Sequence, residues 1–220
     1  MKVGAGHGIV NRLKLILLIS VAFTVSFNLS AQPNDTENLK PRAQWLQVGY
    51  TSNALGYGVN RALNKVFWQG RVHIKQGFSI NYQRNIFYYK KFFAIDWGIN
   101  VSAWQTSGRN PDFDPSLPEE WFFTFSVFPV FRINFVNTQN LETYLFYTVG
   151  GPSCISKTTL DGYDVGKHFI FLDNMGLATF FGTKKQYNVE LRIGHYSNAD
   201  LFPPNYGVKV PLTLLLGYRF

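Results

Sequence analysis

Apolar and polar residues alternate along most of this chain with a period of two. In the run 121–135, for example, the polar residues all fall on even positions. This alternation is typical of β-strands that place one apolar face against a nonpolar environment. The pattern therefore predicts an all-β protein with eight strands, at 45–50, 72–82, 93–101, 121–135, 141–149, 168–181, 185–197 and 207–220.

The alternation also indicates which side chains share a face. Within 72–82 it places Val72 and Phe78 on the same apolar face. The runs 141–149 and 168–181 are divided less cleanly, so the sequence leaves the two faces of these strands unassigned.

The links between the strands alternate between long and short. A soluble β-sandwich would show the same period of two, but regular alternation of long and short links is typical of an outer-membrane barrel. The chain also ends on a strand whose terminal aromatic, Phe220, resembles the assembly signal of such barrels. We therefore predict an eight-stranded antiparallel up-and-down transmembrane β-barrel in the outer membrane, with long external loops and short periplasmic turns. The long links are 51–69, 103–119, 150–166 and 198–206, and the short ones are 84–90, 136–140 and 182–184.

The segment 51–69 fits this scheme least well. Its apolar residues Leu55, Val59, Leu63 and Val66 have the spacing of a helix. A short interfacial helix and an extension of the strand both remain open here.

The first 31 residues have the layout of a secretory signal peptide. Basic residues precede a run of thirteen mostly apolar residues from Leu15 to Phe27. The small residues Ser30 and Ala31 follow, directly before Gln32. We predict cleavage after Ala31, which would leave residues 32–220 as one barrel domain.

Composition and charge narrow the range of functions. Aromatic residues make up 17% of the chain and charged residues 15%, and the formal net charge is +8. Removal of the signal peptide would leave 18 basic residues against 13 acidic ones, with no run rich in Lys and Arg. This modest excess argues against nucleic acid as a partner and favours anionic lipid headgroups. An eight-stranded barrel is filled by side chains, which argues against a porin.

Candidate chemistry is concentrated in the stretch His195-Tyr196-Ser197-Asn198. His195 and Ser197 are two positions apart on a predicted strand, so they share a face at roughly 6.5 to 7 Å. The predicted topology places both at the external end of the seventh strand, facing lipid. A neutral imidazole can take the proton of a hydroxyl that attacks an ester.

The stretches 150–152, 168–171, 176–178 and above all 195–207, HYSNADLFPPNYG, resemble the outer-membrane lipid A 3-O-deacylase (PagL-type) and acyloxyacyl-hydrolase-like family. The resemblance covers roughly residues 140–220. It implies Ser197 as nucleophile and His195 as general base. It also implies that Asn205 helps to hold the oxyanion and that Asn198 supplies the amide beside the nucleophile.

Two positions depart from the family pattern. Where the family has a Glu that orients the His, this chain has Lys209, and an ammonium group cannot stabilise an imidazolium. Where the backbone of a Gly is expected to serve the oxyanion, this chain has Asp200. The parity of the last strand places Lys209 towards the lumen unless Pro211 introduces a bulge. Asp200 is then an alternative acidic partner for His195.

Two functions follow from these observations. The first is an outer-membrane esterase that hydrolyses an acyl ester of lipid A or a related outer-leaflet lipid by a Ser-His mechanism. The second is a small non-catalytic barrel with a structural or binding role. We expect no metal and no cofactor, because the histidines are far apart in the sequence and there is one Cys. That residue, Cys154, excludes an internal disulfide, and we expect it to be buried.

Overall fold

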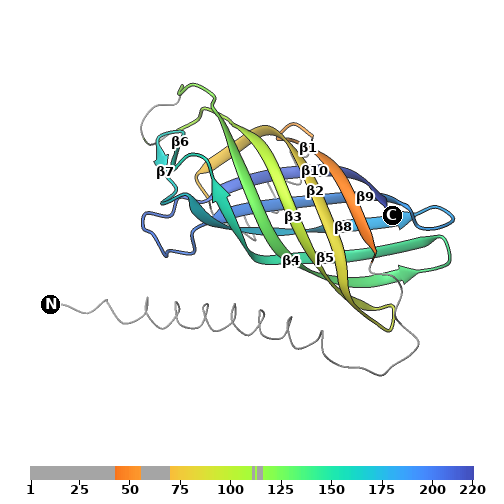
Figure 1. Ribbon diagram of the computed structural model, residues 1–220. Coiled ribbons are helices and arrows are strands. Elements are labelled where there is room, and N and C mark those ends of the chain that lie inside the picture. Colours follow the sequence, from red (N-terminus) through yellow and green to blue (C-terminus); the bar gives the residue numbers. More distant parts are fainter. Residues whose placement is uncertain (1–42, 56–69, 111, 113–115) are drawn as a thin grey trace. The chain divides into compact units, whose positions relative to one another are not determined.

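The computed structural model describes residues 43–55, 70–110, 112 and 116–220 (Figure 1). The predicted signal peptide and the part of the ambiguous segment at 56–69 lie outside these residues. Within the described residues, no helix is long and apolar enough to cross a membrane. The strands are β1 (Gln44–Ser52), β2 (Val72–Tyr89), β3 (Phe93–Thr106), β4 (Trp121–Asn137), β5 (Leu141–Ile155), β6 (Thr159–Leu160), β7 (Tyr163–Asp164), β8 (Phe169–Phe181), β9 (Tyr187–Ser197) and β10 (Val208–Arg219).

Eight of these strands close into a barrel. Each long strand pairs antiparallel with the next along the chain, and β10 closes the ring by pairing with β1. The two short strands β6 and β7 form a separate hairpin between β5 and β8 (Figure 1). The predicted eight-stranded up-and-down barrel is therefore confirmed, with a small hairpin added in one long loop.

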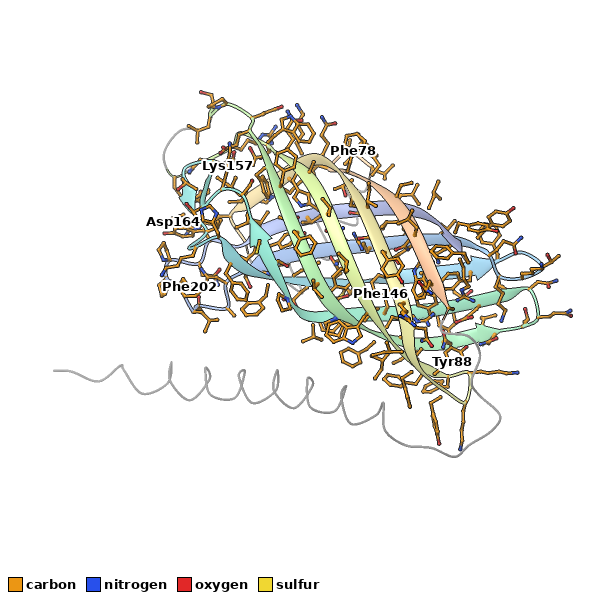
Figure 2. The ribbon with its side chains drawn as sticks, viewed as in Figure 1. Phe78, Tyr88, Phe146, Lys157, Asp164 and Phe202 are labelled. Atoms are coloured by element: carbon orange, nitrogen blue, oxygen red, sulfur yellow. The ribbon has the colours of Figure 1, made fainter. Side chains whose placement is uncertain are left out.

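The outer surface of the barrel is apolar. Large hydrophobic side chains project outwards from the strands, as Phe78 does in Figure 2. Phe78 is 56% exposed and Leu216 is 53% exposed, and similar residues occur on every strand of the ring. A soluble domain would bury such side chains, whereas a bilayer covers them.

The interior of the barrel is filled by a polar and charged network. Arg132 forms a bidentate ion pair with Asp96, with Nε 2.6 Å from Oδ2, and lies 3.3 Å from Glu142. The Arg132 guanidinium also lies over the rings of Trp45 and Tyr144. This inverted polarity, apolar outside and ionic inside, is that of a membrane-spanning barrel with a filled lumen.

Two details of the expected strands were wrong. The ladder between β2 and β3 shifts register between Ile74 and Gln76. This β-bulge reverses the parity, so Val72 faces the interior while Phe78 faces outwards. Cys154 is exposed on the outer surface near the end of β5, and is not buried.

Candidate active site

His195 and Ser197 lie at the C-terminal end of β9, at the end of the barrel that carries the long loops. Both lie on the outward face, as the alternation predicts, because Asn188, Glu190 and Arg192 on the same strand point into the lumen. His195 is 7% exposed and Ser197 is half-buried.

Tyr196, between them, points inwards and anchors the strand. Its hydroxyl lies 3.0 Å from Thr124 Oγ1, and its ring packs edge-on against Trp104 with ring centroids 6.5 Å apart. Because the inward side chain is fixed, the positions of His195 and Ser197 on the opposite face are fixed with it.

The turn after β9 is held together by Asn198. Its side chain is fully buried, and its Nδ2 lies 2.8 Å from the carbonyl oxygen of Phe202, 3.1 Å from that of Val165 and 3.2 Å from that of Pro204. Asn198 therefore ties two loops together directly beside Ser197. Its amide faces the backbone of the loops and not the outer surface.

Asn205 and Asp200 form the outer part of the same turn. The backbone N–H of Asn198 donates to Asn205 Oδ1 at 3.0 Å, and Asn205 Nδ2 donates to Asp200 Oδ1 at 3.1 Å. Ala199 and Asp200 both have positive φ, of 52° and 58°. An amide has two N–H groups, so the bond to Asp200 uses one of the two that Asn205 carries.

Lys209 lies directly beside His195. The two residues are partners in the ladder between β9 and β10, and partners in an antiparallel ladder share a face. The prediction that Lys209 points into the lumen was therefore wrong. The cause is the exception that the sequence allowed, a bulge at Pro211. A bulge separates Val210 from Thr213, where Pro211 has no N–H to donate to the ladder. Val208 and Val210 are buried instead.

A row of ionisable side chains crosses the outer face of four strands at this level. Asp173 on β8 is the ladder partner of His195 on one side, and Lys209 is its partner on the other. Lys209 pairs in turn with His73 at the start of β2, where β10 and β2 run parallel. Position by position, the row reads Asp173, His195, Lys209 and His73.

Like His73, Asp173 is a residue of this row that the sequence pattern did not single out. It belongs to the run 168–181, whose faces could not be assigned. In the structure Ile170, Leu172 and Asn174 are buried, so Asp173 lies on the outward face. Its Oδ1 accepts a hydrogen bond of 2.8 Å from the backbone N–H of Gly150. If the two faces of this strand had been assigned from the sequence, the outward position of Asp173 would have been predicted.

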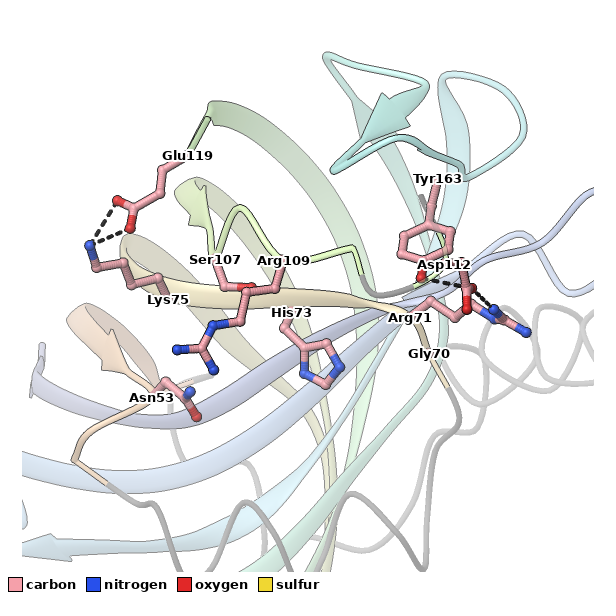
Figure 3. Close-up of a pocket in the computed structure, with 10 residues that line it drawn as sticks. All are labelled: Asn53, Gly70, Arg71, His73, Lys75, Ser107, Arg109, Asp112, Glu119 and Tyr163. Carbon is pink, nitrogen blue, oxygen red and sulfur yellow. Dashed lines mark hydrogen bonds and ion pairs between the residues drawn. The ribbon is translucent and has the colours of Figure 1, made fainter. Parts of the chain in front are cut away.

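A pocket of about 700 Å³ opens next to this row, at the long-loop end (Figure 3). Figure 3 shows Arg109 and His73 between two groups of paired residues. The stem of Lys209 packs against Gly70 in the wall of the pocket, and the charges of Lys209 and Arg109 both act on His73. In one group Lys75 binds Glu119 at 2.6 Å, and in the other Arg71 and Tyr163 both bind Asp112.

The paired residues leave the pocket with a surplus of positive charge. The hydrogen bond with Tyr163 and the negative charge of Asp112 raise the pKa of Arg71, so this guanidinium stays protonated. Its charge and that of Lys75 are balanced by Asp112 and Glu119, whereas no carboxylate among the described lining residues pairs with Arg109. The pocket can therefore attract an anionic group. Among the described residues, no group of three or more His, Cys, Asp or Glu side chains could hold a metal ion.

Comparison with known proteins matches this chain to one protein family and to several solved structures of outer-membrane proteins. A family model described as lipid A 3-O-deacylase (PagL) matches residues 76–219. The crystal structure of the outer membrane enzyme PagL is similar to this chain with a TM-score of 0.53 and 18% sequence identity, over 80% of this chain and 98% of that chain. No curated protein sequence matches.

Two further solved structures are more distant. The outer membrane protein Ail of Yersinia pestis has a TM-score of 0.42 and 12% identity, over 81% of this chain and 99% of that chain. Neisserial surface protein A has a TM-score of 0.42 and 10% identity, with the same coverage of 81% and 99%.

Proposed function

The chain belongs to the lipid A 3-O-deacylase (PagL) family, and on this premise we propose that it hydrolyses an acyl ester of lipid A or of a related lipid in the outer leaflet. The observation that carries the proposal is the placement of His195 and Ser197. They share the outward face of β9 at the long-loop end, where an acyl ester in the outer leaflet can reach them.

The reaction begins with the Ser197 hydroxyl. Its Oγ attacks the ester carbonyl carbon while His195 takes the hydroxyl proton, which gives a tetrahedral intermediate with a negative oxygen. His195 then returns the proton to the departing sugar hydroxyl, and an acyl-serine remains. A water molecule, deprotonated by the same imidazole, releases the fatty acid and restores Ser197.

The turn after β9 would stabilise the oxyanion. We assign the second N–H of the Asn205 amide and the backbone N–H of Asp200 to this role. Loss of one such donor costs about 10²- to 10³-fold in kcat in other hydrolases. Asn198 acts as a positioning residue, because its buried amide holds the loops that present Asn205.

The cationic pocket supports an anionic lipid as substrate. His73 lies one strand beyond Lys209, which is beside His195, and Arg109 from the loop after β3 lines the same pocket as His73. A phosphate on the lipid headgroup would lie near the charges of Lys209 and Arg109 while the acyl chain stays in the bilayer against the apolar barrel wall. The headgroup would thus place the ester at Ser197.

The proposal is tested by mass spectrometry of lipid A from cells that express the wild type, Ser197→Ala or His195→Ala. We expect loss of one acyl chain with the wild type and intact lipid A with both variants, all three proteins forming heat-modifiable barrels on gels. Equal deacylation by Ser197→Ala would remove Ser197 from the mechanism.

The rival function, a non-catalytic barrel, is favoured by one observation. Lys209 stands where the family resemblance implies an acid, and a cation beside His195 opposes formation of an imidazolium. Intact lipid A in every sample of the experiment above would decide for this alternative.

A further inference from the structure

We propose that Asp173 of β8 supplies the carboxylate that positions His195 and stabilises its protonated form. This inference rests on the proposed ester hydrolysis. The acid would come from the strand before His195, whereas the family resemblance implies an acid on the strand after it, where this chain has Lys209.

The ladder register brings the two side chains together. Asp173 and His195 are direct partners between β8 and β9, with Phe171 and Ser197 the next outward-facing pair along the same two strands. Directly opposed residues of an antiparallel pair have Cβ atoms about 4.5 to 5.5 Å apart, on the same face. A carboxylate and an imidazole at that separation are within hydrogen-bonding reach of one another.

The placement of Asp173 is exceptional among the acids of the barrel. The eight described barrel strands carry four carboxylates, and three of these, Asp96, Glu142 and Glu190, are buried in the lumen. Asp173 is the one that faces outwards. An ionisable group on a lipid-facing surface is costly, so its presence at the level of His195 calls for a function.

The surrounding backbone fixes the carboxylate. The ladder between β5 and β8 shifts register between Thr148 and Gly151, so the N–H of Gly150 leaves the ladder. This N–H donates to Asp173 Oδ1 instead. A carboxylate has two oxygens that accept hydrogen bonds, so one oxygen can be held by the bulge while the group still faces His195.

A structural role for Asp173 at the bulge does not require its charge. The amide oxygen of an Asn accepts a hydrogen bond from Gly150 as a carboxylate does. Asp173→Asn therefore keeps the size of the side chain and the bond to the bulge, and removes the negative charge. A loss of activity in this variant reports on the charge.

The charge has a defined role in the reaction. When the Ser197 Oγ–carbon bond forms, the hydroxyl proton moves to His195 and the imidazole becomes positive. Asp173 stabilises this positive charge and opposes the repulsion from Lys209 on the other side. With the acid supplied by β8, position 209 is free to carry a cation that faces the headgroup pocket.

The test moves the acid from one side of His195 to the other. The wild type, Ser197→Ala, Asp173→Asn, Lys209→Glu and the double variant Asp173→Asn/Lys209→Glu are purified as folded barrels in detergent. Initial rates are measured on purified lipid A and on a neutral p-nitrophenyl acyl ester, which has no phosphate for Lys209 to bind. Heat-modifiable migration confirms that each variant is folded.

We expect Asp173→Asn to lower kcat on the ester by about 10²- to 10⁴-fold with little change in KM, as loss of the acid does in a Ser-His-Asp enzyme. In the Asp173→Asn background, Lys209→Glu should raise kcat on the ester at least tenfold, because the new acid is also a ladder partner of His195. A folded Asp173→Asn protein within twofold of the wild type would overturn the inference, and so would a loss that Lys209→Glu does not relieve. An inactive wild type, or an active Ser197→Ala, would instead overturn the proposed hydrolysis itself.

Discussion

Replacement of Asn198 by Ala should disable the catalytic turn while leaving the barrel intact. The Asn198 amide donates to carbonyl groups of Val165, Phe202 and Pro204, all of which belong to loops and none to the barrel ladder. Removal of both N–H donors loses about 1 kcal/mol for each, and leaving the buried carbonyl of Val165 unsatisfied adds a further 1 to 3 kcal/mol. The local cost is therefore about 3 to 5 kcal/mol.

This cost falls on the segment 198–207, which carries Asn205 and the backbone of Asp200. Since about 1.4 kcal/mol corresponds to a tenfold change in an equilibrium, the ordered turn would be disfavoured by about 10²- to 5 × 10³-fold. We expect kcat on lipid A to fall by about 10²-fold. Chymotrypsin should also cleave the variant faster after Tyr206, which lies in this segment and is followed by Gly207.

The matched control is Asn140→Ala, which removes an exposed Asn from a short turn at the other end of the barrel. It should leave kcat and the rate of cleavage unchanged. Wild-type kcat and wild-type resistance to chymotrypsin in Asn198→Ala would refute the positioning role.

Three further predictions follow from the structure. Lys209→Glu alone should change kcat on the neutral ester by less than tenfold, because Asp173 already supplies an acid; a gain near 10⁴-fold would show that the wild type lacks one. Arg109→Gln should raise KM for lipid A with two phosphates by about fivefold, the effect of roughly 1 kcal/mol from one partly exposed ion contact, with kcat and the KM of the neutral ester unchanged. Arg132→Met should lower the free energy of unfolding by about 3 to 5 kcal/mol, since Asp96 and Glu142 lose their buried partner; urea titration of the protein folded in lipid vesicles measures this, and an unchanged midpoint would contradict it.

The strands could be predicted from the sequence because one face of each meets lipid and the other a filled lumen. This requirement produces the period of two, so the number of strands can be counted from the alternation in the sequence. The β6–β7 hairpin was not predicted, since two-residue strands leave no periodic signal in a loop.

The predicted parity was lost at two of the bulges that interrupt the ladders. A bulge adds one residue to one strand, so every later side chain changes face. This occurs between Ile74 and Gln76 and again between Val210 and Thr213. The second case decided the orientation of Lys209, and Pro211 was the one signal for it in the sequence.

The sequence could indicate His195 and Ser197 because they lie on one strand, and the family resemblance indicated position 209. It could not indicate Asp173 and His73. Asp173, Lys209 and His73 reach His195 or one another through ladder register between four strands. Register depends on turn geometry and bulges along the whole barrel. The cationic pocket, built from β2, β7 and the loops after β1 and β3, could not be predicted from the sequence for the same reason.

The central claim, hydrolysis of a lipid acyl ester by Ser197, is tested most directly on the purified protein. Lipid A in detergent is incubated with the folded wild type or with folded Ser197→Ala, and free fatty acid and residual lipid are measured together by mass spectrometry. We predict that the wild type releases one fatty acid per lipid A and that Ser197→Ala releases none. Release of fatty acid by both proteins, or by neither, would contradict the account.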